Sequence, residues 1–325
     1  MKNDKKVYEK ILVQIEKNVD SKNLECVIEG CSNIAINSHI LQKNGILNSI
    51  STANHFHEYK NADIFDFAKS NSGKELRFRK TGVNKAHSYR TLCSEHDTNL
   101  FKSIEKHPID FDDYNVHLLF AYRTVLSLTR KEQIVQEKIL RKIASKRLNE
   151  PHPALQSMRK DNDQILKEIN KALEERGSEI KRLESNLSLE RKDYAFIKLN
   201  YPLKKVYSSS RQKTPKTGET FYVNIFPYNN ASNVLIFYPK EYKDSWFDDY
   251  LESWTGLTEK EFERRLTTHL FLNCENWGIA KEHLENVSQK ELDKTILISQ
   301  KLRYNFNVRA DLSYSIGFNL FSKDR

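Results

Sequence analysis

The sequence predicts an α+β fold in three successive parts. The first part carries two pairs of metal-binding side chains separated by strand-like segments. The second part contains two long runs with the apolar spacing of helices, on either side of a Pro-His-Pro break, and the third contains short β-type runs. We therefore expect a metal-binding domain over residues 1–112, a helical hairpin over 113–193 and an α+β domain over 194–325.

The composition is that of a folded protein with a moderate positive charge. The chain has 325 residues, which is long enough for two domains, and 38% of them are hydrophobic. Lys and Arg outnumber Asp and Glu by 53 to 44, and the formal charge of +9 suits an anionic partner such as nucleic acid. Only 9 residues are Gly, and neither G-x-x-x-x-G-K nor G-x-G-x-x-G occurs, so we expect no glycine-rich phosphate loop.

The N-terminal residues MKNDKKVYEK are charged and lack the apolar run of a signal peptide. No window approaches 18 apolar residues, so we expect no membrane-spanning helix and no membrane partner. The expected location is the cytoplasm, where thiols stay reduced and closely spaced cysteines favour a metal ion over a disulfide.

The most specific motif is a pair of Cys and Cys/His knuckles. Cys26 and Cys31 form C-x4-C in CVIEGC, and Cys93 and His96 form C-x2-H in LCSEH. Three thiolates and one imidazole make a complete tetrahedral ligand set for zinc, so we predict one structural zinc ion on these four residues. Gly30 supplies the tight turn that the first knuckle needs.

The other elements of the first part are short. Apolar residues at helical spacing predict an amphipathic helix over 6–19, and a strand-like segment over 35–40 carries His39. Residues 51–90 include the possible strand pieces HFHEY and ELRFRKTG, whose pairing the sequence leaves open. A helix is expected to begin near Asp97, because an acidic residue in a first turn is favoured by the helix dipole.

The middle part is predicted to be an antiparallel helical hairpin. Apolar residues recur at helical spacing over 114–149 and 154–193, and the PHP at 151–153 separates the two runs. Asp112 and Asp113 are candidate caps for the first helix. The charged faces are typical of solvated helices, and the hairpin is a candidate surface for formation of a homo-oligomer.

The last part predicts an α+β domain. Its β-type runs are YAFIKLNY, TFYVNIFPY and NVLIFYP, and helical patterns follow over 241–254 and 259–272 and in ENWGIAKEHLENV. We expect DLSYSIGFNLF to be a last strand and Cys274 to be a small buried residue. The Trp and Tyr side chains are interpreted as core rather than as surfaces for base stacking.

The order C-x4-C, then SHI with His39, then LC-x2-HD with Asp97 resembles the zinc-stabilised HNH endonucleases of the treble-clef type. In that family a ββα unit holds one catalytic divalent ion, and a histidine on the first strand is the general base. The resemblance implies that His39 is the base, that Asp97 binds Mg²⁺ or Mn²⁺ where the family usually has a histidine, and that nucleic acid is the substrate.

Ser38 departs from that family, which often has Asp or another His before the base, and Asn84 is only a candidate for its middle asparagine. The chain is also similar to uncharacterised bacterial proteins with the pattern C-x4-C, SH, C-x2-HD-x2-LF-x2-IE, which ends here at Glu105. From the two-part layout of a nuclease domain and a C-terminal sensing domain, we expect a bacterial anti-phage effector.

Phosphodiester hydrolysis needs a base and a cation that stabilises charge on the phosphorus. A neutral imidazole such as His39 suits the first role, and the carboxylates of Asp97 and Glu105 are hard oxygen ligands for the second. If they lie on one helix, Asp97 and Glu105 are roughly 12 Å apart along its axis. They are then too far apart to bind the same ion, and Asp97 is the preferred ligand.

Each of these residues could instead have a purely structural role. His39 could donate a hydrogen bond inside the finger, Asp97 could orient the ring of His96 or cap a helix, and Glu105 could pair with a neighbouring lysine. The alternative function is therefore a non-catalytic, zinc-stabilised protein that binds nucleic acid or another protein.

The basic residues nearest to the second knuckle are candidate phosphate contacts, with a solvated loop as the competing interpretation. They are Arg77, Arg79, Lys80, Lys85 and Arg90.

Overall fold

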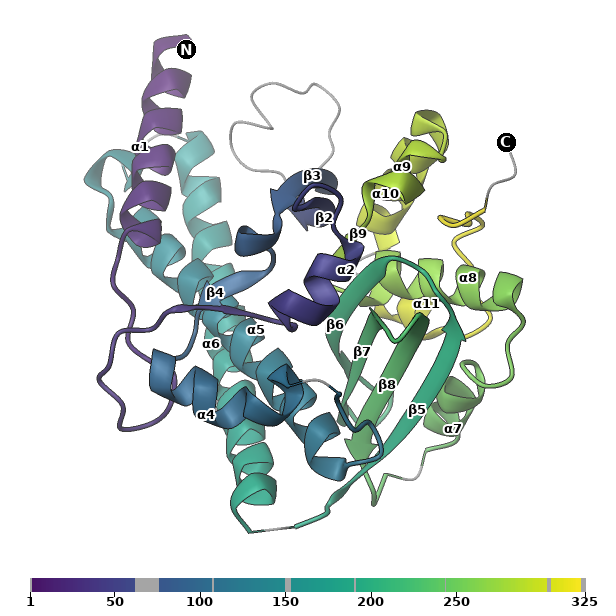
Figure 1. Cartoon of the computed structure of the whole chain (residues 1–325). Helices are drawn as coiled ribbons and strands as arrows, with labels where there is room; N and C mark the ends of the chain where they lie inside the picture. The colour runs from purple at the N-terminus through teal and green to yellow at the C-terminus, as the bar shows by residue number, and fades with distance from the viewer. Residues whose placement is uncertain are drawn as a thin grey trace. The chain divides into compact units, whose positions relative to one another are not determined.

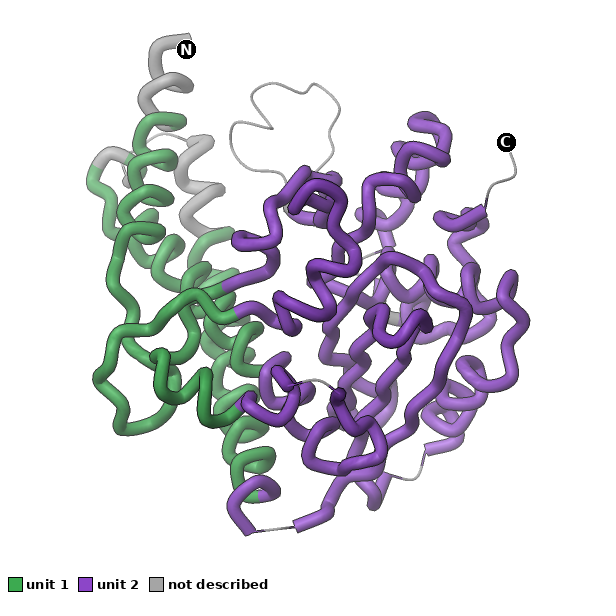
Figure 2. The backbone as a smooth tube through the Cα atoms, viewed as in Figure 1, with its two compact units in different colours: residues 1–38, 89–100, 125–185 green, residues 39–88, 101–124, 186–325 purple. Residues whose placement is uncertain are grey.

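The computed structural model of the chain describes residues 2–61, 76–106, 108–149, 153–189, 191–242, 244–302 and 305–322. Figure 1 shows helices and strands in mixed order, which confirms the predicted α+β class. The chain separates into two compact units, coloured in Figure 2, and each is assembled from separate stretches. Unit 1 comprises residues 1–38, 89–100 and 125–185, and unit 2 comprises 39–88, 101–124 and 186–325. No helix in these described ranges is long and apolar enough to cross a membrane.

Unit 1 is built mainly from helices. They are α1 (Lys2–Asp20), the residues of α4 (Ser94–Glu105) up to Leu100, the residues of α5 (Tyr114–Ala144) from Val125 onward, and α6 (Pro153–Ser188) up to Ser185. The first of these confirms the amphipathic helix predicted over 6–19. Its apolar residues Ile15 and Val19 are buried, as expected for the core-facing stripe of such a helix.

Helices α5 and α6 run antiparallel within unit 1, as predicted. Gln136 donates a hydrogen bond to the Asn170 side chain at 2.7 Å, and Arg176 donates to the Leu128 carbonyl at 3.0 Å. Lower numbers on α5 therefore lie beside higher numbers on α6. A short 3-10 helix, η3 (Lys146–Asn149), follows α5, and Pro153 occupies the first position of α6, where its missing N–H has no intrahelical partner to lose.

Unit 2 is organised around a seven-stranded antiparallel sheet with the strand order β3-β2-β9-β6-β7-β8-β5. The strands are β2 (His55–Asn61), β3 (Leu76–Gly82), β5 (Tyr194–Pro202), β6 (Val206–Lys213), β7 (Thr220–Tyr228), β8 (Ala231–Pro239) and β9 (Asn276–Ile279). Between β7 and β8, Asn229 and Asn230 have φ angles of +49° and +58°, the left-handed pair that a two-residue hairpin turn requires.

Strands β2 and β3 lie between the two metal-binding knuckles in sequence but join the sheet of the C-terminal strands. β2 pairs with β3 on one side and with β9 on the other, with Tyr59 opposite Trp277. The Tyr59 ring lies 5.1 Å from Phe78, 5.1 Å from Trp277 and 5.3 Å from Phe271, between ring centroids. These aromatic contacts bury the face shared by the three strands and explain why the sheet extends to β3.

Short helices follow the strands of unit 2. They are α7 (Ser245–Glu252), α8 (Glu259–Thr268), the π-helix η4 (His269–Asn273), α9 (Lys281–Glu285), α10 (Gln289–Leu302) and α11 (Phe306–Ala310). The prediction of a strand in DLSYSIGFNLF, residues 311–321, is wrong, because this segment forms turns and bends. Its apolar residues Ile316, Leu320 and Phe321 are buried in the core of unit 2 without strand pairing. Their burial produces the apolar pattern that resembles a strand.

A buried polar cluster links strand β2 to strand β6 across β9. Glu58 of β2 is fully buried, and its Oε1 accepts hydrogen bonds from the His87 backbone at 2.7 Å and from the Tyr207 hydroxyl at 2.6 Å. Lys60 forms an ion pair with the same carboxylate. Burial alone would raise the pKa of Glu58, but His87, Lys60 and Tyr207 outweigh it, and the pKa lies below the ordinary value of 4.5.

We expect Glu58→Gln to lower the free energy of unfolding by roughly 3–5 kcal/mol. The substitution removes the negative charge of the carboxylate and leaves its buried partners without a counter-charge. Since the folded-state pKa is lowered, the stabilisation is present above pH 4.5 and is lost as the pH falls through the folded value. Urea unfolding of wild type and variant at neutral and acidic pH measures both effects. Glu241→Gln, at an exposed position of unit 2, is the control. Equal unfolding midpoints for the two variants would contradict the prediction.

Candidate metal centre and active site

The first knuckle is a short hairpin-like loop in unit 1. The Cys26 amide donates to the Asn33 carbonyl at 2.9 Å, and the Ala35 amide donates to the Leu24 carbonyl at 2.8 Å. Gly30 has a φ of +79°, in the left-handed region that glycine adopts without steric cost, so the tight turn predicted for this residue is present. The loop thereby folds Cys31 back toward Cys26.

Backbone hydrogen bonds hold the second knuckle beside the first. The Val27 amide donates to the Thr91 carbonyl at 3.0 Å, and the Ile36 amide donates to the Leu92 carbonyl at 2.7 Å. Cys93 directly precedes α4, and the helix begins at Ser94, three residues before the start expected from the sequence. The backbone amide of His96 is the main factor that lowers the pKa of Cys93 to about 7, which favours the thiolate that binds metal ions.

The four predicted ligand residues converge on one point. One ligand atom from each of Cys26, Cys31, Cys93 and His96 lies within 4.8 Å of the others. The Cys31 and Cys93 sulfurs are 4.0 Å apart, and the His96 Nδ1 lies 3.2 Å from the Cys93 sulfur and 3.4 Å from the Cys26 sulfur. Bond lengths of about 2.3 Å for Zn–S and 2.0 Å for Zn–N give tetrahedral edges of about 3.5–3.8 Å. The cluster could therefore hold a metal ion.

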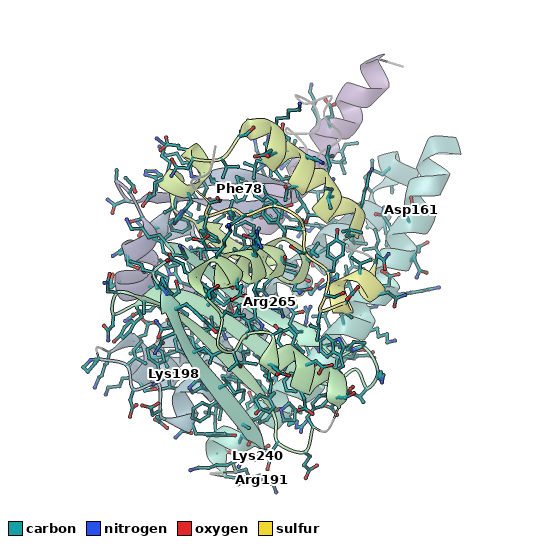
Figure 3. All side chains as sticks on the ribbon, turned by 90° about the vertical axis from the view of Figure 1, so that its right-hand side faces the viewer. Phe78, Asp161, Arg191, Lys198, Lys240 and Arg265 are labelled. Carbon is teal, nitrogen blue, oxygen red and sulfur yellow. The ribbon has the colours of Figure 1, made fainter. Side chains whose placement is uncertain are left out.

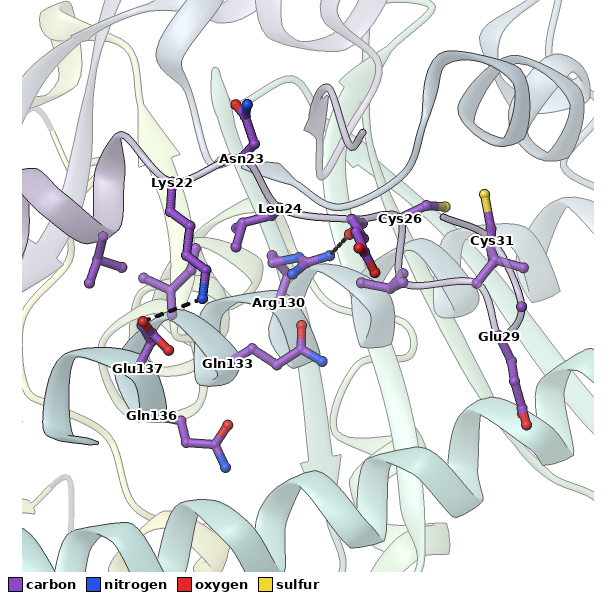
Figure 4. Close-up of a pocket in the computed structure, with 16 residues that line it drawn as sticks. Lys22, Asn23, Leu24, Cys26, Glu29, Cys31, Arg130, Gln133, Gln136 and Glu137 are labelled. Atoms are coloured by element: carbon purple, nitrogen blue, oxygen red, sulfur yellow. Dashed lines mark hydrogen bonds and ion pairs between the residues drawn. The ribbon is translucent and has the colours of Figure 1, made fainter. Parts of the chain in front are cut away.

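Arg130 of α5 contacts the loop of the first knuckle. Its Nη2 donates to the Glu25 carbonyl, as the dashed line in Figure 4 marks, and its side chain is buried. Burial lowers the pKa of Arg130, and the neighbouring Cys26 acts in the opposite direction. A hollow of 660 Å³ lies beside this loop, and Lys22 and Glu137 of its lining form an ion pair at 3.4 Å. The contact of Arg130 with the loop could not be predicted from the sequence, because it joins residues 105 positions apart.

His39 ends strand β1 (Asn37–His39), which pairs with β4 (Ser88–Arg90) in a two-stranded sheet. Within unit 2, the half-buried His39 places its Nε2 3.1 Å from the Val83 carbonyl oxygen. Because a carbonyl only accepts hydrogen bonds, this contact favours the tautomer with the proton on Nε2 and a lone pair on Nδ1. Nδ1 has no hydrogen-bond partner among the described residues and is not a fully buried atom.

The surroundings of His39 keep its ring neutral. Burial is the largest influence and lowers its pKa below the ordinary 6.5, and the charges of Arg123 and Lys43 act in the same direction. Glu105 acts in the opposite direction, which places this carboxylate in the electrostatic neighbourhood of His39. The Glu105 carboxylate also pairs with Arg123 at 2.6 Å, and its backbone carbonyl accepts a hydrogen bond from Gln42 at 2.6 Å.

Asp97 lies in unit 1, in the first turn of α4. Its backbone amide donates to the Cys93 carbonyl at 2.9 Å. Its Oδ1 is buried and accepts no hydrogen bond from a described residue. Asp97 is not one of the four clustered ligands, and the described residues include no second group of three or more His, Cys, Asp or Glu side chains that could hold an ion. Its role as a cation ligand remains a prediction.

A basic hollow of 790 Å³ lies next to His39 in unit 2. Val83, whose carbonyl bonds His39, and Lys43, whose charge acts on it, both line the hollow. Its walls come from η1 (Lys43–Leu47), α2 (Asn48–Ile50), the end of β3 and η2 (Val83–Lys85). Among the described residues, its lining has three lysines, four asparagines and no acidic side chain. The lysines and asparagines are Lys43, Lys80, Lys85, Asn44, Asn48, Asn54 and Asn84. Ammonium and amide groups of this kind are typical of phosphate-binding surfaces.

The structure divides the five predicted basic contacts. Lys80 and Lys85 line the basic hollow. Arg77 and Arg79 alternate with Lys80 along β3, so they project from the other face of that strand. Arg90 belongs to unit 1, where it donates to the carbonyls of Lys22, at 2.7 Å, and of Asp20, the last residue of α1. It thus caps the C-terminal end of that helix.

Comparison with known proteins gives no further guide, because no protein family, no curated protein and no solved structure matches the chain.

Proposed function

We propose that this chain is a metal-dependent endonuclease of the HNH type that hydrolyses phosphodiester bonds in nucleic acid. In this proposal the Cys3His cluster binds a structural zinc ion in a treble-clef finger, and His39 is the general base. The observation that carries the proposal is the placement of His39. Its Nε2 is held by a backbone carbonyl, its Nδ1 has no partner among the described residues, and a lysine-lined hollow lies beside it.

The neutral ring of His39 is suited to accept a proton from water on Nδ1. The oxygen of that water then attacks the phosphorus, the bond from phosphorus to the leaving oxygen breaks, and the leaving oxygen takes a proton from solvent. Lys43, Lys80 and Lys85 would hold the phosphodiester and offset the negative charge that develops on its oxygens. The asparagine amides of the hollow would donate to the same backbone.

A bound Mg²⁺ or Mn²⁺ would stabilise the charge of the pentavalent phosphorus. The candidates for holding it are Asp97 in unit 1, whose buried Oδ1 accepts no hydrogen bond from a described residue, and Glu105 in unit 2, whose charge acts on His39. One protein carboxylate is enough in principle, because Mg²⁺ commonly retains several waters and binds substrate phosphate oxygens.

The decisive experiment incubates the purified zinc-loaded protein with supercoiled plasmid and with single-stranded RNA. We expect nicked or linear DNA, or shortened RNA, in MgCl₂ or MnCl₂, and no scission with EDTA. The same reactions distinguish the two substrates. If a protein with one zinc per chain cuts neither nucleic acid in either cation, the endonuclease proposal is wrong.

A second candidate is a zinc-stabilised protein that binds nucleic acid without cutting it. It is favoured by the ion pair between Glu105 and Arg123. Glu105 is the carboxylate whose charge acts on His39, and its pairing with Arg123 makes it less available to bind a cation. This protein would retard DNA or RNA in a gel-shift assay and lose affinity with rising salt, but would leave every strand intact.

A further inference from the structure

We infer that unit 2 contains a second binding site, distant in sequence from His39, for a small phosphate monoester that carries a flat ring, such as a mononucleotide. The site is a hollow of 480 Å³ lined by the residues that follow α7, by α8 and by the C-terminal segment, with Arg265 of α8 in its wall. Figure 3 labels Arg265 on this helix. The inference does not depend on the nuclease proposal, because the two sites share no residue.

The first observation is the uncompensated charge of Arg265. Its Nε and Nη2 are buried, and neither has a hydrogen-bond partner among the described residues. The guanidinium carbon lies 4.7 Å from the Trp254 ring centre and 5.1 Å from the Tyr250 ring centre. Aromatic faces attract a cation but do not neutralise it, and a buried charge is normally paired with an anion. Burial accordingly lowers the pKa of Arg265.

The second observation is the unpartnered histidine next to Arg265. His269 is fully buried, and neither of its ring nitrogens has a hydrogen-bond partner among the described residues. Trp254 and Tyr250 hydrogen-bond each other through their side chains, so His269 is the residue whose polar atoms are left without a partner here. The His269 and Trp254 rings are in edge-to-face contact, with centroids 5.5 Å apart. Native proteins bond the great majority of their buried polar groups, so these ring nitrogens of His269 require an explanation.

The backbone next to Arg265 departs from regular α-helix geometry. His269 begins the π-helix η4 directly after α8, and π-turns are frequent at functional sites because they cost backbone stability. Burial, together with the charges of Arg265 and Arg309, lowers the pKa of His269 to about 3. His269 is therefore neutral at physiological pH and leaves Arg265 as the charged group next to it.

The lining of the hollow indicates the class of ligand. It offers the guanidinium groups of Arg264 and Arg265, several hydroxyl groups and two aromatic side chains, Tyr314 and Phe318. The hydroxyls belong to Ser253, Thr268, Ser313 and Ser315. Glu261, the acidic member of the lining, is engaged in the capping box of α8, where it accepts a hydrogen bond from the Thr258 amide at 2.8 Å. The volume lies within the usual range for small-molecule sites, about 300–1,000 Å³.

These groups match the two parts of a nucleotide. Nη1 of Arg265 is the guanidinium nitrogen that is not buried, and a phosphate that accepts its hydrogen bonds compensates the whole delocalised charge. The hydroxyls of Thr268 and Ser315 accept hydrogen bonds from backbone amides and keep their own protons for the remaining oxygens. A base stacks on an aromatic side chain, as bases do on Tyr and Phe in other proteins. An uncharged ring lacks the phosphate, and inorganic phosphate lacks the ring, so each is expected to bind more weakly than the complete molecule.

The test uses the full chain, thermal melting and isothermal titration calorimetry, with adenosine monophosphate, guanosine monophosphate, inorganic phosphate and adenosine as probes. We expect at least one monophosphate to bind and to raise the Tm, with affinity at least roughly tenfold above that of phosphate or adenosine. Equal binding by phosphate alone would overturn the ring part of the proposal. If none of the four probes binds the wild type, the proposed ligand class is wrong.

Arg265→Gln should abolish nucleotide binding while the ligand-free Tm stays the same or rises, because an unpaired buried charge has been removed. Lys260→Gln is the matched control, since it removes one positive charge from an exposed position of α8 outside the hollow. If Arg265→Gln does not fold, Arg265→Lys keeps the charge but loses the planar guanidinium, and its affinity should fall at least roughly tenfold. Wild-type affinity in the folded Arg265 variant would overturn the proposal.

Discussion

Cys93→Ser is expected to abolish the zinc binding proposed for the Cys3His cluster and to destabilise unit 1 strongly. The serine oxygen is a poor replacement for the thiolate in a set of four ligands whose atoms lie within 4.8 Å. Binding of a structural zinc ion contributes directly to folding, so the Tm should fall by roughly 10 °C or more. Zinc per chain, measured by inductively coupled plasma mass spectrometry, should fall from about one to near zero.

Cys274→Ser is the matched control for that loss, because it removes a thiol outside the cluster. Cys274 Sγ donates to the Asn276 carbonyl at 3.3 Å, and burial raises its pKa to about 12, so it remains a protonated thiol. This variant should retain its zinc. Treatment of the wild type with a strong chelator should reproduce the melting curve of Cys93→Ser. A Cys93→Ser protein with one zinc per chain and an unchanged Tm would contradict the assignment.

His39→Ala is expected to reduce strand scission by roughly 10²–10⁴-fold, the usual contribution of a general base. The half-buried ring makes one hydrogen bond to the protein, to Val83, so zinc content and Tm should change little. Because the pKa of His39 is lowered from 6.5, the base is already neutral at pH 7. Wild-type cleavage should therefore persist below pH 6.5 and decline only as the pH falls through the lower folded value.

His55→Ala provides the comparison for His39→Ala. His55 lines the same basic hollow but is exposed, and its Nδ1 donates to the Ala53 carbonyl at 2.8 Å. We expect this variant to cut within a few-fold of the wild-type rate. Equal rates in the two histidine variants, or a His39→Ala protein that melts early while the wild type never cuts, would indicate a structural role for His39.

The sequence by itself determined the features that depend on local spacing. The C-x4-C and C-x2-H pairs limit which side chains can share one ion, and the four residues do converge. The apolar periodicity on either side of residues 151–153 was sufficient to predict α5 and α6, because helix formation depends on contacts three and four residues apart. Gly30 adopts the left-handed turn for the same local reason.

Only the tertiary structure decided which distant segments meet. The pairing of β2 with β9 joins residues more than two hundred positions apart, and no short pattern in HFHEY or NWGI specifies that partner. The support of the Cys26 loop by Arg130, the charge of Glu105 near His39 and the unpartnered guanidinium of Arg265 likewise arise from packing. In a helical sequence pattern, an arginine is normally predicted to lie on the solvated surface. The contacts of Arg265 with Trp254 and Tyr250 follow only from the way α8 packs in unit 2.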